Sequence, residues 1–293
     1  MESSQRFKSR YPQFSSVTLK KQPVIAVIGT GTIGRAIVES LINHGFRGKI
    51  IATRRRIEEI MDLTEKGIEV TRNNRKAAKN ADIIMLCIKP FDIKSVLQEI
   101  KDEIKGKLVI SFVTAVPLKF LKKIAPNAKF IRAMPNVAVL AQASFTAYCT
   151  DPDVTDNEKE VAKEIFKAMG TFWEVDEKYM DAITGLSGSA PAYIATIIEA
   201  MMYAGLKVGL PRELALYSSI YAVLGTAKLA LNSKKHIAEL KDMVVTPGGV
   251  TIEGIYELED SRIRTAIMRA IEAATQKSKK IAKIILSEID SKD

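Results

Sequence analysis

The alternation of apolar and polar positions divides the chain into two halves. In the first half, short apolar runs alternate with stretches of helical periodicity. Residues 23–28 form an apolar run typical of a buried strand, and a glycine-rich turn separates it from an apolar-periodic helix over 33–44. The same reasoning predicts strands at 49–53, 82–88, 108–112, 129–133, 144–150 and 171–175, and helices at 56–66, 93–104, 118–124 and 155–169. This order predicts an α/β fold with a doubly wound, mostly parallel sheet of the Rossmann type.

After about residue 176 the strand signals end. Residues 191–206, 211–231 and 260–288 read as helices, and prolines open two of them. The chain of 293 residues is long enough for two domains. We therefore expect a Rossmann domain over 22–176 and an all-helical domain over 177–293. Residues 1–21 show no structural period, so we expect a basic, disordered N-terminal extension, whose composition also fits a transit peptide.

Composition and charge argue against several classes of protein. Hydrophobic residues make up 47% of the chain, which is typical of a globular protein. The net charge of +10 is scattered, so we expect a solvated basic surface and no nucleic-acid partner. No apolar run approaches the roughly 20 residues of a membrane span, so we expect no membrane partner. Cys87 and Cys149 read as reduced core residues of a cytoplasmic protein, and no cluster has metal-ligand spacing.

The glycine-rich turn is a complete G-x-G-x-x-G motif, formed by Gly29, Gly31 and Gly34. It follows a predicted strand and opens a helix, which is the context that dinucleotide binding requires. Gly29 permits the tight turn, Gly31 lets the backbone approach a pyrophosphate, and Gly34 lets helix and strand pack closely. The helix N-terminus then offers N–H groups and partial positive charge to the phosphates.

The end of the second strand selects between cofactors. An NAD site usually has Asp or Glu about 20 residues beyond the glycines. Here the chain reads Thr53-Arg54-Arg55-Arg56, with no carboxylate before Glu58. Arginines suit a ribose 2′-phosphate through their charge and planar donor fork. The sequence therefore predicts NADP, with NADPH preferred and NADH as the alternative; Arg56 is expected to point away along the next helix.

Two further strand ends border the same crevice, because ligands of open α/β sheets bind beyond the carboxyl ends of the strands. One carries Lys89 and Pro90, and the other carries Met134 to Asn136. The predicted cofactor-binding residues are thus Gly29, Thr30, Gly31, Thr32, Ile33, Gly34, Thr53, Arg54, Arg55, Cys87, Ile88, Lys89, Pro90, Met134, Pro135 and Asn136.

The helical half contains two polar, glycine-rich segments, residues 184–193 and 246–251. Both precede helices, so both can offer backbone N–H groups and hydroxyls to a substrate carboxylate. Helix capping by Ser, Thr and Gly explains either segment alone equally well. His44 and His236 are the only histidines, and neither has a catalytic setting. We read His44 as a surface residue and His236 as structural.

Taken together, these segments make the chain resemble the pyrroline-5-carboxylate reductase family over nearly all residues after 22. The resemblance rests on the glycine motif and on Ile88-Lys89-Pro90, Arg132-Ala133-Met134-Pro135-Asn136, Gly185-Leu186-Ser187-Gly188-Ser189 with Pro191-Ala192-Tyr193, Gly209-Leu210-Pro211, and Leu240 through Thr251. The chain departs from the family pattern at Thr246, which replaces a usual Ser, at Val250, and at His236-Ile237, which replaces His-Pro.

The resemblance implies reduction of 1-pyrroline-5-carboxylate to L-proline by NAD(P)H, the last step of proline biosynthesis. It places Thr184 beside the ring nitrogen as a hydrogen-bond partner. It places the carboxylate on Gly248, Gly249, Val250 and Thr251. It further implies a helical dimerisation domain, and hence a homo-oligomer that is at least a dimer, with a decamer built from dimers as an open alternative. Residues 191–231 carry only five charges, which also predicts helices covered by a second copy.

Two other functions remain open from the sequence. A reductase of the β-hydroxyacid dehydrogenase type would use a catalytic lysine on a C-terminal helix, for which Lys207 and Lys228 are candidates. A non-catalytic dinucleotide sensor would bind NADPH without turnover.

Overall fold

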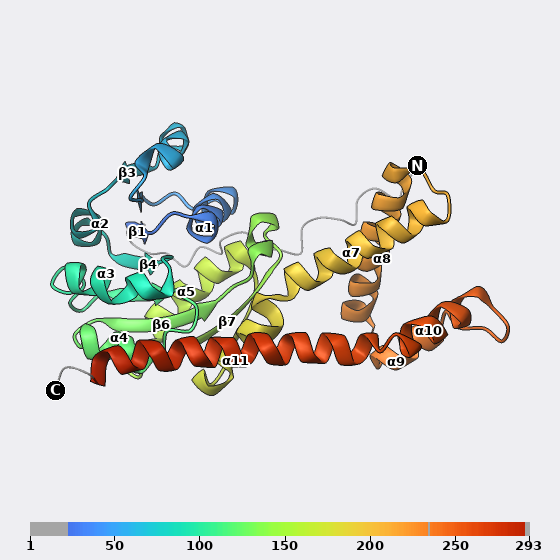
Figure 1. The fold of residues 1–293 in the computed structure, drawn as a ribbon. Coiled ribbons are helices and arrows are strands. Elements are labelled where there is room, and N and C mark those ends of the chain that lie inside the picture. The colour runs from blue at the N-terminus through green and yellow to red at the C-terminus, as the bar shows by residue number, and fades with distance from the viewer. Residues whose placement is uncertain (1–22, 234, 291–293) are drawn as a thin grey trace. The chain divides into compact units, whose positions relative to one another are not determined.

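The computed structural model describes residues 23–233 and 235–290. They form two compact units. The first contains the described residues up to Gly188 together with those from Ala274 onward, and the second contains Ser189–Ala273. One helix, α11 (Ile263–Asp290), begins in the second unit and ends in the first (Figure 1). The N-terminal extension and its expected disorder lie outside the described residues.

An eight-stranded sheet organises the first unit, in the order β3-β2-β1-β4-β5-β6-β7-β8. All neighbouring strands are parallel except β6 and β7, which are antiparallel. The chain moves from β1 outward through β2 to β3, then crosses back to place β4 on the other side of β1. This reversal creates the crevice in which open α/β sheets bind ligands. The strands are β1 (Ile25–Ile28), β2 (Ile50–Thr53), β3 (Glu69–Thr71), β4 (Ile83–Leu86), β5 (Leu108–Ser111), β6 (Lys129–Met134), β7 (Ser144–Thr150) and β8 (Gly170–Glu174).

Helices cover both faces of this sheet, which confirms the doubly wound prediction. One apolar cluster combines strand residues with Ile37 of α1, Leu63 of η1 and Phe166 of α5. A second combines strand residues with Leu97 of α3, Phe120 of α4 and Ile285 of α11. The helical segments of this unit are α1 (Thr32–Asn43), η1 (Ile57–Lys66), α2 (Asn74–Asn80), η2 (Pro90–Asp92), α3 (Ile93–Ile100), α4 (Leu118–Ile124), η3 (Val137–Ala141), α5 (Asp156–Met169), η4 (Glu177–Tyr179), α6 (Met180–Ile183) and η5 (Thr184–Gly188).

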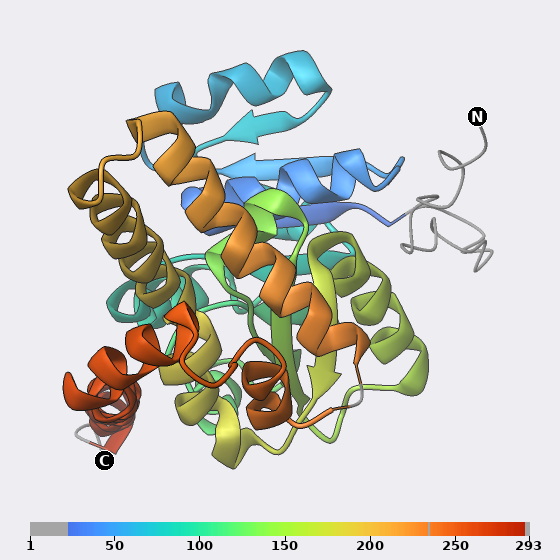
Figure 2. The same cartoon turned by 90° about the vertical axis from the view of Figure 1, so that its right-hand side faces the viewer.

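The second unit is helical, as the sequence predicts. Its helices are α7 (Ala190–Lys207), α8 (Arg212–Asn232), α9 (Ile237–Asp242), α10 (Val250–Asp260) and the first part of α11. α7 and α8 pack against each other (Figure 2), and Gly205 makes this approach close, because a side chain there would meet Ala215. α7 and α10 contain no fully buried residue, and α8 contains only Ala215 and Ser219. Large apolar side chains therefore stay exposed on this unit within one chain.

Among the described residues, one helix is long and apolar enough to cross a membrane. This is α8, and 11% of its apolar stretch is buried within the chain. Length and composition alone do not separate a membrane span from a helix that another polypeptide covers.

The predicted helix over 56–66 is present, and it takes the 3₁₀ form over residues 57–66. Other features differ from the sequence-based expectations. β3 was not expected, because its three residues are too few to show a period. α2 was not expected either, although Asn73 caps it by accepting a hydrogen bond from the Lys76 N–H at 2.8 Å. His236 likewise caps α9, its Nδ1 accepting from the Ala238 N–H at 3.2 Å, whereas His44 is half-buried, not a surface residue.

Candidate dinucleotide and substrate site

The glycine motif forms a tight turn between β1 and α1. The Gly29 and Thr30 N–H groups both donate to the Thr53 carbonyl, at 3.2 and 2.8 Å. Gly29 has a φ of +89°, and a Cβ there would lie 2.9 Å from the Cys87 carbonyl oxygen. A Cβ at Gly34 would lie 2.7 Å from the Gly29 carbonyl oxygen. Both positions therefore require glycine, for the reasons that the motif predicts.

Gly31 differs from the other two glycines. It is the N-cap of the 12-residue helix α1, and no side chain caps the first turn. A Cβ at Gly31 would meet nothing within 4 Å, so open space lies above the helix N-terminus. Backbone N–H groups and partial positive charge face that space. This arrangement fits the pyrophosphate of a dinucleotide, since a side chain at Gly31 would occupy the space that the phosphates need.

The two arginines after β2 have different surroundings. Arg54 donates through Nη1 to the Thr30 carbonyl at 2.7 Å and pairs with Glu59, so it braces the glycine turn. The Arg55 side chain is 86% exposed and is held by one ion pair, 2.9 Å from the Asp92 carboxylate. A single exposed ion pair contributes little to stability. Arg55 is consequently the better placed of the two to turn toward a phosphate.

Asn74 is a residue of this region that the sequence reasoning missed. The Thr53 hydroxyl donates to its Oδ1 at 2.7 Å, and its Nδ2 donates to Glu99 at 3.0 Å. It therefore stands beside Thr53, where the sequence predicts the ribose site. The sequence contains one indication of the helix that begins at Asn74. Asn73 precedes a polar run with alanines, and an Asn in that position is a typical helix N-cap.

The residues after β4 form one wall of the glycine turn. The Cys87 N–H donates to the Ile28 carbonyl at 2.8 Å, and the Ile88 side chain lies where a Gly29 Cβ would project. Burial raises the pKa of the Cys87 thiol, which keeps it neutral and excludes a nucleophilic role at ordinary pH. Lys89 is exposed and Pro90 begins η2.

The residues after β6 contact the segment that carries Thr184. The Asn136 Nδ2 donates to the Ser187 carbonyl at 3.2 Å, and the Met134 methyl lies 2.8 Å from a Cβ built on Gly188. Thr184 is 9% exposed, and its hydroxyl donates to the Met180 carbonyl at 2.8 Å. β1, β2, β4 and β6 thus bring the predicted residues of the first unit to one group of strand ends, with Thr184 joined to it through Asn136.

The predicted carboxylate loop lies in the second unit. Gly248 has a φ of +67°, and Gly249 is the N-cap of the 11-residue helix α10. The Gly249 N–H donates to the Thr246 carbonyl at 3.0 Å, so Thr246 closes the turn ahead of the helix. Val250 is 91% exposed and Thr251 is half-buried at the first turn. The loop therefore presents a helix N-terminus on the surface of its unit.

Comparison with known proteins decides the family. A family model described as pyrroline-5-carboxylate reductase dimerisation matches residues 177–281, and one described as NADP oxidoreductase coenzyme F420-dependent matches residues 24–115. The pyrroline-5-carboxylate reductase of Methanosarcina acetivorans is 38% identical over 264 residues, which cover 88% of this chain and 98% of that protein. The chain belongs to the pyrroline-5-carboxylate reductase family.

Solved structures of the family have the same fold. The pyrroline carboxylate reductase of Plasmodium falciparum, determined with NADP bound, aligns with a TM-score of 0.84 and 29% identity over 89% of this chain and 99% of that one. The reductase of Coxiella burnetii aligns with a TM-score of 0.82 and 34% identity over the same shares of the two chains. The predicted resemblance and the predicted fold class are both confirmed.

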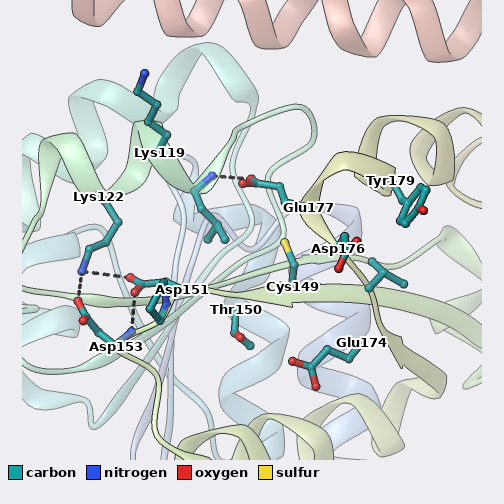
Figure 3. A pocket seen from close by; sticks show the side chains of 13 residues that line it. Lys119, Lys122, Cys149, Thr150, Asp151, Asp153, Glu174, Asp176, Glu177 and Tyr179 are labelled. Atoms are coloured by element: carbon teal, nitrogen blue, oxygen red, sulfur yellow. Dashed lines mark hydrogen bonds and ion pairs between the residues drawn. The ribbon is translucent and has the colours of Figure 1, made fainter.

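A hollow of about 1130 Å³ lies elsewhere on the first unit (Figure 3), at the ends of β7 and β8, where β6 begins. Its lining includes no residue predicted for the family's active site. Several of its charges have partners: Lys122 pairs with Asp151 and Asp153 inside the hollow, and Glu177 pairs with Arg132 outside it and accepts from the Leu118 N–H. Burial raises the pKa of the Cys149 thiol on its wall to about 12.

Proposed function

We propose that this protein reduces 1-pyrroline-5-carboxylate to L-proline with NADPH, the last step of proline biosynthesis. The observation that carries the proposal is the 38% identity to a pyrroline-5-carboxylate reductase across nearly the full length of both chains. The glycine turn and the open helix N-terminus at Gly31 agree with it, because the reaction needs a bound dinucleotide. The β-hydroxyacid dehydrogenase and sensor alternatives have no comparable support.

NADPH supplies the hydride when bound. The turn at Gly29–Gly34 would hold its pyrophosphate, and Arg55 would reach its 2′-phosphate by leaving Asp92. The NADP-bound relative and the NADP oxidoreductase model over residues 24–115 support NADP over NAD. NADH remains the secondary cofactor of this proposal.

Thr184 is assigned to the nitrogen of the substrate. A hydroxyl has one proton to donate, and that of Thr184 goes to the Met180 carbonyl. Toward a ligand the Thr184 oxygen therefore acts as an acceptor, which suits the N–H of a protonated cyclic imine. Protonation of that nitrogen makes its carbon a better hydride acceptor. Thr184 would thus orient the reactive form of the substrate without transferring a proton itself.

The carboxylate of the substrate is assigned to residues 248–251. The N-terminus of α10 offers the backbone N–H group of Val250 and the Thr251 hydroxyl, with no cationic side chain required, while the Gly249 N–H closes the turn on the Thr246 carbonyl. Gly248 permits the chain reversal through its positive φ. We retain 22–176 as the dinucleotide-binding domain and 177–293 as the dimerisation and substrate domain, a division supported by the dimerisation model over 177–281.

The protein is a homo-oligomer, as its dimerisation domain indicates. We propose a dimer as the basic assembly, because α7, α8 and α10 leave most of their apolar side chains uncovered within one chain. A decamer built from such dimers is the larger form of this proposal. The proposal also includes a cytoplasmic location and a small-molecule substrate. In it, a second subunit covers α8, and lipid does not.

The direct experiment measures NADPH oxidation with freshly prepared 1-pyrroline-5-carboxylate and identifies L-proline among the products. The proposal predicts stoichiometric conversion of NADPH and substrate into NADP and proline. Folded, oligomeric protein that binds NADPH and forms no proline would contradict it and favour a sensor.

Replacing Arg55 by Ala is expected to raise the Michaelis constant for NADPH about tenfold and to leave that for NADH unchanged. The loss corresponds to one charge-assisted hydrogen bond of about 1.5–3 kcal/mol, at the low end because the site is exposed. Steady-state kinetics with both cofactors is the measurement.

Two matched variants separate the roles of the arginines. Arg54→Ala removes the brace on the Thr30 carbonyl and should weaken both cofactors equally. Asp92→Asn removes the carboxylate that competes for Arg55 and should lower the Michaelis constant for NADPH. Equal responses of NADPH and NADH to Arg55→Ala would contradict the assignment.

Thr184→Val is expected to lower kcat about tenfold with NADPH affinity unchanged, because it removes a hydroxyl while preserving shape. Thr184→Ser keeps the hydroxyl and should retain most of the turnover. The measurement is kcat and KM for both substrates, with thermal unfolding as the check on folding. If the Val and Ser variants have the same kcat, the Thr184 hydroxyl has only a structural role in the helix.

A further inference from the structure

The five-residue segment η5 that begins at Thr184 is a π-helix. π-Helical turns are rare, and they often occur at functional sites. Two side chains from elsewhere in the first unit contact this turn and the helical segment before it. One lies on β6, and the other lies two residues after β6 ends.

Asn136 holds the C-terminal part of η5. Its Nδ2 donates to the Ser187 carbonyl at 3.2 Å and to the Ser187 hydroxyl at 3.4 Å. Its Oδ1 accepts from the Ala138 N–H at 3.1 Å, and its own N–H donates to the buried Ser144 hydroxyl at 3.0 Å. Both ends of the Asn136 amide are therefore engaged inside the protein, and the donor end is directed to η5.

Arg132 holds the N-terminal side. It lies on β6 and is 4% exposed. Its guanidinium is 3.1 Å from Glu177 and 3.6 Å from Asp181, and Asp181 also accepts from the Ser278 hydroxyl at 2.7 Å. Asp181 lies in α6, one residue after Met180, whose carbonyl receives the Thr184 hydroxyl. The segment before Thr184 is thus held by β6 and the segment after it by Asn136, two residues beyond β6.

We propose that Asn136 is a positioning residue for the reaction: by holding Ser187 it sets the π-helical turn that presents Thr184. This assignment replaces the cofactor contact that the sequence predicts for Asn136. It rests on the proposed function, since it assumes that Thr184 meets the substrate. A displacement of a positioned group by about 1 Å can cost on the order of 100-fold in rate.

Asn136→Asp isolates the donor. The carboxylate still accepts from the Ala138 N–H, but it donates nothing to Ser187 and repels that carbonyl. We expect kcat to fall at least tenfold, with the NADPH dissociation constant, measured by fluorescence of the bound cofactor, within twofold of the parent. Asn127→Asp makes the same change at an exposed asparagine and should alter neither. Asn136→Ala replaces it if the Asp variant does not fold.

Hydrogen exchange supplies a readout that does not depend on turnover. Amides of residues 185–190 should exchange at least tenfold faster in Asn136→Asp than in the parent or in Asn127→Asp. This result would stand even if the parent enzyme reduced a different imine. A dissociation constant for NADPH that rises at least tenfold with kcat unchanged would overturn the proposal and restore the cofactor contact, and unchanged exchange would overturn it as well.

Discussion

Replacing Tyr221 by Asp is expected to separate the oligomer and to abolish turnover. Tyr221 lies in α8 and is 66% exposed within one chain, so the substitution removes few contacts inside the subunit. In the proposed dimer it would bury a carboxylate without a partner, which costs several kcal/mol per ion. Sedimentation or light scattering at low micromolar concentration gives the mass, and NADPH oxidation gives the activity.

Position and control matter for this experiment. Ile220, the neighbouring residue, is half-buried within its own unit, so a charge there would also unfold the subunit. Leu224, 42% exposed, is the independent second site on α8. Met61→Asp introduces the same charge at a 47% exposed residue of η1 in the first unit, and it should leave mass and activity unchanged. A stable, fully active monomer carrying Tyr221→Asp would refute the proposed assembly.

The second large effect concerns the glycine turn. Gly31→Ala is expected to weaken NADPH binding by roughly 100-fold while leaving the melting temperature unchanged. The added methyl meets nothing within 4 Å in the protein itself, so folding tolerates it. The methyl projects into the space that the pyrophosphate requires, so NADPH binding is expected to be weakened. Fluorescence titration with NADPH and thermal unfolding are the two measurements.

Gly29→Ala adds the same methyl group at a glycine where the protein itself has no room for it. Its φ of +89° disfavours an L side chain by about 1–2 kcal/mol. The methyl also collides with the Cys87 carbonyl oxygen at 2.9 Å, and such overpacking costs about 1–3 kcal/mol. Gly29→Ala should therefore lower the melting temperature along with NADPH affinity. If both variants lose stability equally, the open space at Gly31 is not a ligand site.

The sequence predicts the sheet well, because its central strands are continuous apolar runs. Short runs of this kind are typical of strands that are buried on both faces. β1, β2, β4 and β5 are buried throughout, at nearly the predicted positions. β3 is half-buried and three residues long, and no pattern of that length separates a strand from a loop. The helix at residues 57–66 was predicted, but its apolar spacing does not distinguish a 3₁₀ helix from an α-helix.

The candidate site follows from the sequence only in outline. Motif spacing places Arg54 and Arg55 together, yet their difference depends on where the Thr30 carbonyl points after the chain has folded. From the sequence, Asn136 is only one of several residues at strand ends. Its distinct role depends on the hydrogen bond from its amide to Ser187, 51 residues away. Contacts of this kind depend on the tertiary structure and leave no periodic signal in the chain.

The length of α11 has a consequence for how its sequence can vary. The helix has 28 residues, so it runs about 42 Å, and its later part meets the first unit through Ser278 and Ile285. Inserting one residue between Ser278 and Ile285 would rotate one of them relative to the other by about 100°, so that Ser278 could no longer bond to Asp181 while Ile285 stays in the apolar cluster. Seven residues would restore the phase to within about 20°, although they would shift it along the axis. Length changes in relatives should therefore gather in the loops, leaving α11 constant between these anchors.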